Sequence, residues 1–293
     1  MAFTFTSFAE WKNEAIDNNI ALHEVVLNYE IALKSTDKDT IYQKMLANYQ
    51  VMCEAIQTGL TDDMTSFSRM INNGGKKVND CKIDVLGLDF KILVATTIAA
   101  KEVNSCMGRI VAAPTAGASG IIPGVLYNLE LKHNLDKQTI ADALLLTAGI
   151  ALIIHQKASL SGAVGGCQAE TGSASAMAAG AIVYSLGGSI DQVFNAVAIA
   201  IQCTLGLVCD PVAGLVEVPC VVRNASAASI AFTAAQIAIA DVSAVIPVDE
   251  CIEAMGEIGL AMENRYKETA LGGLAATKTG KEIKERVFGY KKK

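Results

Sequence analysis

Aromatic side chains are scarce in this sequence, and several familiar signals are missing. Aromatic residues make up 5% of the 293 residues, whereas hydrophobic residues make up 52%. The core must therefore be built mainly from Ala, Val, Ile and Leu, whose small side chains suit closely packed helices. The formal net charge is −6 and no basic stripe appears, which argues against a nucleic-acid partner.

Signals for secretion and for membrane insertion are also absent. The N-terminal sequence MAFTFTSFAEWKNE has no basic segment followed by an apolar run, so we predict no signal peptide. The most apolar stretch, Ala143–Ile154, is shorter than the roughly 20 residues that a membrane-spanning helix needs, and it is typical of a buried helix. We therefore expect a cytoplasmic protein with no membrane segment.

The sequence lacks the strict alternation of exposed strands, a GxGxxG motif after a strand, and internal repeats. It predicts instead an all-α, multi-helix fold in which Gly-rich loops converge on one site. Ser7 and Glu10 form a capping-box pattern, and helical spacing continues to about Leu33. A polar break at 35–39 precedes a second helix to Gln57, before Gly59.

We interpret these two helices as an antiparallel hairpin over residues 1–60, which belongs to the same domain as a catalytic segment over 61–293. Residues 74–87 are predicted as a loop, and the basic tail 284–293 as solvated. Further helices are predicted over 88–106, 120–133, 137–157, 168–186, 189–204, 218–240 and 248–265, with Asp136, Ser189 and Asp249 as possible N-caps.

Eight cysteines are present without any CxxC pair, which argues against a zinc knuckle. Cys167, Cys209 and Cys220 each adjoin Gly or Pro, at intervals of 209 − 167 = 42 and 220 − 209 = 11. Three thiolates on converging loops can hold three corners of a cubane iron–sulfur cluster and leave one iron open as a Lewis acid. From the residues alone, three buried thiols are an equally good interpretation. The other five lie in helical contexts and are predicted as small core residues: Cys53, Cys81, Cys106, Cys203 and Cys251.

Four long motifs resemble a known family: GRIVAAPTAGASGIIPGVL, LSGAVGGCQAETGSASAMAAGA, LGLVCDPVAGLVEVPCVVRNASAAS and GGLAATKTGKEI, which begin at residues 108, 160, 205 and 272. In this order, and with these cysteine intervals, they are similar to the α chain of bacterial iron–sulfur-dependent L-serine dehydratase. The resemblance runs from about residue 90 onward and is weaker before it. It implies a [4Fe–4S] cluster on Cys167, Cys209 and Cys220, and β-elimination of L-serine to pyruvate and ammonia.

The segment 113–124, APTAGASGIIPG, precedes a predicted helix, whose first N–H groups favour an anion. Taken alone, an ordinary helix–helix turn is the simpler interpretation. The resemblance implies that this segment lines the substrate site and cradles the substrate carboxylate. Its candidate residues are Thr115, Ala116, Gly117, Ser119 and Gly120.

Two further groups of polar residues adjoin the cysteines. Ser159, Ser161, Gly162, Gln168 and Glu170 could bind the carboxylate or the ammonium of the substrate, or could simply cap a helix and face solvent. Arg223 and Asn224 follow Cys220; Asn224 is a candidate substrate ligand, and Arg223 could pair with the substrate or with Asp210 or Glu217.

No catalytic base can be assigned from the sequence. His23, His133 and His155 fall in or beside helical stretches and are expected to be structural or surface residues. In the resembled family the α chain often pairs with a β chain, so the resemblance implies such a partner as one source of the base; a homo-oligomer is a further partner that we expect. Two alternatives stay open: a related iron–sulfur L-cysteine desulfidase, and a non-catalytic iron–sulfur protein.

Overall fold

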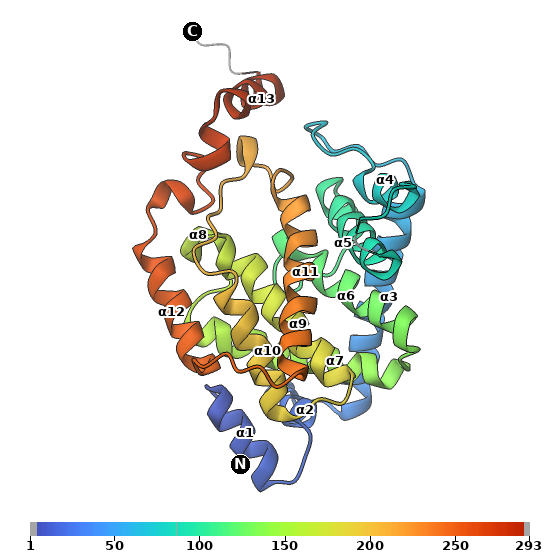
Figure 1. The fold of residues 1–293 in the computed structure, drawn as a ribbon, viewed down its shortest axis with the longest axis vertical. Helices are drawn as coiled ribbons and strands as arrows, with labels where there is room; N and C mark the ends of the chain where they lie inside the picture. The colour runs from blue at the N-terminus through green and yellow to red at the C-terminus, as the bar shows by residue number, and fades with distance from the viewer. Residues whose placement is uncertain (1–4, 86, 290–293) are drawn as a thin grey trace.

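The structure is a computed structural model that describes residues 5–85 and 87–289. Over these residues it contains thirteen α-helices, several short 3₁₀ turns and only isolated β-bridges, which confirms the all-α prediction (Figure 1). The helices are α1 Phe8–Asp17, α2 Leu22–Lys34, α3 Lys38–Thr61, α4 Gly74–Asp80, α5 Leu88–Ser105, α6 Ile121–His133, α7 Lys137–Lys157, α8 Gly162–Gly165, α9 Ser173–Ser185, α10 Ile190–Gln202, α11 Cys220–Ile239, α12 Val248–Ala261 and α13 Lys278–Phe288.

The small, apolar helix α9 lies at the centre of the core. Its residues from Ser173 to Val183 are all buried, and it packs against α6, α7, α10 and α11. Helix α7 is long and apolar enough to cross a membrane by length and composition alone. However, 61% of its most apolar 18-residue window is buried inside the protein, as in a core helix.

The N-terminal region differs from its prediction. The stretch predicted as one helix from Ser7 to about Leu33 is two helices, because the chain turns sharply between them. Asn19 has a φ of 52°, a left-handed conformation that Asn tolerates better than most residues. Ala21 is then extended, and its N–H donates to the Glu24 carboxylate (2.9 Å).

The predicted domain division at residue 60 stays a prediction, although α2 contacts α7 and α3 contacts α5 in the following segment. The only tryptophan of the chain, Trp11, fixes α1 to this core. Trp11 is fully buried, its Nε1–H donates to the Leu22 carbonyl (3.0 Å), and its ring stacks on Phe5 at 5.2 Å and lies 5.8 Å from Phe194.

The prediction of a loop over 74–87 is wrong for its first half, where α4 forms. The two glycines that suggested a loop instead allow α4 to pack on α5. A Cβ on Gly75 would lie 2.7 Å from Ala99, and Glu102 accepts hydrogen bonds from the N–H groups of Gly74 (2.7 Å) and Gly75 (2.9 Å). Glu102 thus serves as the cap that no side chain of α4 itself provides.

Two of the three predicted N-caps are confirmed. The Asp136 carboxylate accepts from the N–H of Thr139 (2.8 Å), and Ser189 forms a reciprocal capping box with Gln192. Asp249 is a correction, because the cap position of α12 is Pro247. Its carboxylate accepts instead from the first N–H groups of α1, at Phe8 (3.1 Å) and Ala9 (3.2 Å).

The C-terminal tail is mostly exposed over its described residues, as predicted, but its chain is helical. Residues predicted as a solvated tail form the end of α13, which lies at the opposite end of the molecule from α1 (Figure 1). The last residues of that predicted tail, 290–293, lie outside the described residues.

Candidate functional site

Three separate segments bring the three predicted cysteines together. Cys167 lies between α8 and a π-helical turn over Gln168–Gly172, and Cys220 is the first residue of α11. Cys209 lies in a loop that pairs with the chain beyond α12: its N–H donates to the Tyr266 carbonyl (2.8 Å), and its carbonyl accepts from the N–H of Glu268 (2.9 Å). Cys167 and Cys209 are buried, and Cys220 is partly buried.

The protein environment raises the pKa of each of these thiols above its ordinary value. Burial raises the pKa of Cys209, and repulsion from Cys167, Glu170, Glu268 and Cys220 adds to the effect. Burial likewise raises the pKa of Cys167. The mutual influence shows that the side chains are close together. Because a thiolate is the metal-binding form, a metal bound here must displace the protons of these thiols.

The other five cysteines are not gathered in this way. Cys53 and Cys106 are partly buried, and Cys251 is buried. Cys81 and Cys203 are exposed, so their prediction as core residues is wrong.

Arg223 is engaged by the protein itself. Its Nη1 lies 2.9 Å from Asp210 Oδ1 and also donates to the Val208 carbonyl (2.8 Å). Of the two protein carboxylates considered from the sequence, Asp210 is the one that pairs with Arg223. Glu217 instead accepts hydrogen bonds from the hydroxyls of Ser66 and Ser68. Arg223 therefore holds the Cys209 loop to α11, and its charge opposes the burial that raises the pKa of Cys167.

Asn224 joins the loop at 115–120 to the cysteines. Its Nδ2 donates to the carbonyls of Gly117 (2.8 Å) and Cys220 (2.8 Å), and its Oδ1 accepts from the N–H of Gly120 (2.9 Å). The side chain is fully buried. One amide group thus fixes the candidate carboxylate cradle relative to a cysteine more than one hundred residues away in the sequence.

The cradle itself is a 3₁₀ turn, Ala116–Ala118, that leads into α6. Ser119 is 1% exposed, and its hydroxyl has no hydrogen-bond partner among the described residues. A buried hydroxyl without a partner is costly, so a bound ligand would satisfy it. Thr115 lies near the Glu170 carboxylate without reaching hydrogen-bond geometry.

The Glu170 carboxylate faces two glycines of the candidate site. A Cβ on Gly117 would lie 2.9 Å from Glu170 Oε1, and a Cβ on Gly162 would lie 2.7 Å from Oε2 and 3.2 Å from Cys209 Sγ. Burial raises the pKa of the Glu170 carboxyl. Ligand atoms of Glu170, Cys209 and Glu268 all lie within 4.8 Å of one another, an arrangement that could hold a metal ion.

The predicted residues of α8 and the π-helical turn have different surroundings. Ser161 is exposed at the start of α8 and makes no side-chain cap, which contradicts the capping alternative. Gln168 is fully buried; its Nε2 donates to the Met255 carbonyl (2.8 Å) and its Oε1 accepts from the N–H of Gly206 (2.8 Å). Its amide therefore ties the turn after Cys167 to α12 and to the Cys209 loop.

Comparison with known proteins now identifies the family. The sequence model described as serine dehydratase alpha chain matches residues 17–275. The chain belongs to the serine dehydratase α-chain family. It is 43% identical over 272 residues to an L-serine dehydratase alpha chain of Peptoniphilus asaccharolyticus, with 92% of this chain and 93% of that protein covered.

Two other relatives of this α-chain family differ in length. A probable L-serine dehydratase alpha chain of Bacillus subtilis is 42% identical over 276 residues, which cover 93% of this chain and 92% of the relative. An L-serine dehydratase of Escherichia coli is 36% identical over 287 residues. That alignment covers 93% of this chain but 62% of the Escherichia coli protein.

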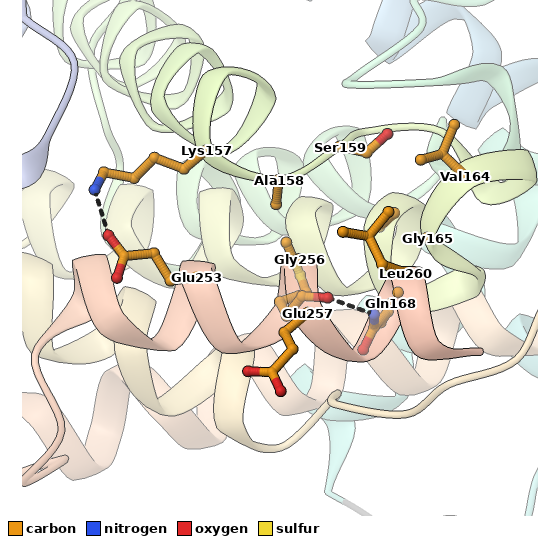
Figure 2. A pocket seen from close by; sticks show the side chains of 13 residues that line it. Lys157, Ala158, Ser159, Val164, Gly165, Gln168, Glu253, Gly256, Glu257 and Leu260 are labelled. Carbon is orange, nitrogen blue, oxygen red and sulfur yellow. Dashed lines mark hydrogen bonds and ion pairs between the residues drawn. The ribbon is translucent and has the colours of Figure 1, made fainter.

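In this serine dehydratase α-chain homologue, a cavity of about 350 Å³ lies between α12 and the end of α7 (Figure 2). Gln168 and Gly165 line it, and the Lys157–Glu253 ion pair (2.8 Å) lies at its edge (Figure 2). Sequence reasoning did not select this cavity.

Two charged residues near the cysteines were also missed. Glu268 reaches Cys209 only because the two segments pair through backbone hydrogen bonds, which no local motif announces. Lys101 is fully buried on α5, and a lone lysine within the apolar sequence LVATTIAAKEV was a signal that could have been read.

The histidines agree with the expectation of structural or surface roles. Among the described residues, none of them forms a hydrogen bond or ion pair with a residue of the candidate site. His23 contacts Tyr184 and Asp142, and His133 and His155 lie in the last turns of α6 and α7.

Proposed function

We propose that this chain is the catalytic α chain of an iron–sulfur L-serine dehydratase, which converts L-serine to pyruvate and ammonia. The observation that carries the proposal is the convergence of Cys167, Cys209 and Cys220 from three segments, with Asn224 linking Cys220 to the loop at 115–120. Family membership and the names of the relatives support the same substrate.

The residues fit a [4Fe–4S] cluster held by these three cysteines. The donor set consists of three neighbouring thiols that are largely buried. The positive charge of Arg223 lowers the pKa of Cys167, and those of Lys101 and Arg223 lower the pKa of Cys220, so both cations favour thiolates here. Three thiolates on a cubane leave one iron without a protein thiolate, and such an iron supplies the Lewis acidity that makes hydroxide a better leaving group. A single metal ion on Glu170, Cys209 and Glu268 is the competing occupant, and iron and sulfide counts distinguish the two.

The chain's own residues bind and orient the substrate. Backbone N–H groups of Thr115, Ala116 and Gly117, with the unpartnered Ser119 hydroxyl, would hold the serine carboxylate, while Asn224 holds the N–H of Gly120. The Glu170 carboxylate, beside Gly162 and near Ser161, would hold the ammonium. Asn224 and Gln168 would keep these loops in place, because their amide groups are occupied by backbone partners.

In the reaction the α-proton leaves Cα and the hydroxyl leaves Cβ. The resulting aminoacrylate tautomerises and hydrolyses to pyruvate and ammonia. Hydrogen bonds to the carboxylate stabilise the charge that develops as the proton leaves. A base must accept that proton.

A β chain, which would also supply the base, is the proposed partner, and the cytoplasm the proposed location. The relative from Peptoniphilus asaccharolyticus is named an alpha chain, and the dehydratase of Escherichia coli is covered over only 62% of its length. Both facts support a second polypeptide that completes the enzyme.

The decisive experiment is anaerobic purification, with and without a co-expressed β chain, followed by iron and sulfide counts and a pyruvate assay. We expect about four iron and four sulfide per chain and pyruvate from L-serine, faster with the β chain. Pyruvate from L-cysteine alone would favour a desulfidase. A cluster without either activity would favour a non-catalytic protein, and iron without sulfide would overturn the cubane.

A further inference from the structure

Lys101 is a buried cation without an anionic partner. Its side chain, near the end of α5, is 0% exposed. Nζ donates to Asn104 Oδ1 (2.7 Å) and to the Val216 carbonyl (3.0 Å), both of which are neutral acceptors. Among the described residues, Lys101 takes part in no ion pair within 4.0 Å.

The position of Lys101 places it between two parts of the candidate site. Val216, which accepts from Lys101, lies four residues before Cys220. Ser105, which is on α5 like Lys101, also donates to the Val216 carbonyl (3.3 Å). On the other side, a Cβ on Gly120 would lie 2.9 Å from the Cβ of Lys101. Helix α5 therefore touches both the approach to Cys220 and the end of the loop at 115–120.

The nearby anions are already satisfied or are themselves part of the site. Glu217 accepts from two serine hydroxyls, and Asp210 pairs with Arg223. The groups whose charge acts on Lys101 are Cys220 first, then Glu170 and Glu217. Cys220, one of the proposed cluster ligands, begins α11 four residues after Val216, whose carbonyl accepts from Lys101.

Burying an unpaired ammonium costs several kcal/mol, and neutral acceptors offset only part of that cost. Burial accordingly lowers the pKa of Lys101 to about 8. A protein that needed Lys101 only as a tether for Val216 could use a neutral donor at lower cost, as Ser105 already shows. The lysine makes sense if negative charge arrives beside it when the site is filled.

We propose that Lys101 is a positioning residue whose ammonium supplies fixed positive charge to the thiolates of the cluster, while its bond to Val216 holds the chain leading to Cys220. The inference rests on the proposed function, since it requires cluster-bound thiolates. The charge lowers the energy of gathering three thiolates and nearby carboxylates in one place.

The test compares Lys101→Met, Lys101→Arg and the control Lys91→Met, in the presence of the β chain. Lys91 lies on the same helix and also donates to a carbonyl, that of Cys81 (3.0 Å), but it is ten residues, or about 15 Å, nearer the start of α5. Three quantities are measured: melting temperature of the cluster-free protein, iron retained against a chelator, and the reduction potential of the reconstituted protein.

For Lys101→Met we expect opposite effects in the two states. The cluster-free variant should melt at or above the wild-type temperature, because an unpaired buried charge is gone. The reconstituted variant should hold iron about tenfold less well and show a lower reduction potential, because a positive charge no longer favours the more negative reduced form. Lys101→Arg should keep the wild-type potential, and Lys91→Met should match wild type throughout.

Several results would overturn the inference. Equal destabilisation of both states would make Lys101 a simple tether. A raised KM for serine with an unchanged potential would assign its charge to the substrate carboxylate. Loss of activity in Lys101→Arg with wild-type potential and iron would make it a base. Failure of the wild-type protein itself to take up a cluster would instead refute the proposed function, so the two failures are distinguishable.

Discussion

At the scale of single residues, Asn224 and Gln168 shape the site by holding backbone groups with their side-chain amides. Asn224 satisfies two carbonyls and one N–H, and Gln168 satisfies one of each. Such residues transmit the position of one loop to another. Their loss should therefore appear both in the stability of the protein and in the affinity of its site.

Replacing Asn224 by Ala should lower the free energy of unfolding by about 2–3 kcal/mol, because three buried backbone groups lose their partners together. Urea unfolding of the cluster-free protein measures this. Asn79→Ala, at an exposed position of α4, should change the free energy of unfolding by less than about 0.5 kcal/mol. An equally small effect of Asn224→Ala would show that the loop at 115–120 is held by other contacts.

The cysteines should separate into two groups when each is replaced by Ala. Cys209→Ala should lose most of the bound iron and reduce activity by more than about tenfold, since even neighbours of metal ligands cost 10–100-fold. Cys203→Ala, at an exposed position just before the same loop, should keep the wild-type iron content. Iron analysis and visible absorbance of the anaerobically purified variants measure the iron content of each. Normal iron in Cys209→Ala would remove this residue from the ligand set.

At the scale of helices, glycines determine how closely the elements approach. Gly59 is inside α3, where a Cβ would lie 2.3 Å from the Ala99 carbonyl of α5. Gly256 is inside α12 beside the cavity, and its nearest neighbours would lie 3.4 Å from a Cβ. The same residue type is therefore required for packing at one position and merely permitted at the other.

Substitution of these two glycines by Ala should have opposite signs. Gly59→Ala should lower the free energy of unfolding by about 1–3 kcal/mol, because backbone atoms must move apart. Gly256→Ala should raise it by about 0.5–1 kcal/mol, because Ala is the better helix former. Thermal or urea unfolding of the two variants measures both changes in the free energy of unfolding. A stabilised Gly59→Ala would mean that α3 and α5 can separate at little cost.

The stability of the protein should depend on pH through His23 of α2, which contacts Asp142 of α7 and Tyr184 of α9. Burial lowers the pKa of His23, although Asp142 and Glu24 oppose this shift and Lys38 adds to it; Tyr184 is hydrogen-bonded to the ring. Below the ordinary pKa of 6.5 the unfolded chain binds a proton that the folded chain resists, so the folded state loses stability as the pH falls.

His23→Gln should therefore lose less stability than wild type between pH 6.5 and pH 5. Urea unfolding at a series of pH values tests the difference in slope. The surface variant His155→Gln is the matched control and should follow the wild-type protein. A steeper loss in His23→Gln than in wild type would reverse the sign and show that Asp142 dominates.

Prediction from sequence worked where the signal is local. The apolar periodicity located α5, α6, α7 and α10 to within about two residues, and Asp136 and Ser189 were recognised as caps. It failed where a distant residue decides the local structure. Glu102 caps α4 from another helix, and Asp249 caps α1 instead of its own helix.

The same division applies to the site. Gly- and Pro-rich contexts pointed to three cysteines that the structure brings together. The pairing of Cys209 with Glu268 depends on segments far apart in the sequence, and no local motif encodes it, whereas the apolar residues around Lys101 were a signal of its burial. The positions of Glu268 and Lys101 could be known only after α5 and the segment beyond α12 had been placed.

At the scale of the whole molecule, the site is assembled from segments spread between residues 101 and 268, more than half of the described chain. Lys101 comes from α5, the cysteines from three later segments, and Glu268 from beyond α12. No short fragment contains all of these residues. The central helix α9 contacts α6, α7, α10 and α11, so the packing that positions the loops is shared.

The burial of Trp11 has a spectroscopic consequence. Because the chain has a single tryptophan, its intrinsic indole fluorescence reports the docking of α1 against Phe5, Phe194 and the Leu22 carbonyl, and not events at the cysteines. If the N-terminal residues belong to the same cooperative unit, the fluorescence transition in urea should coincide with the far-UV circular dichroism transition. An earlier fluorescence transition would reveal that α1 undocks while the rest of the helices stay folded.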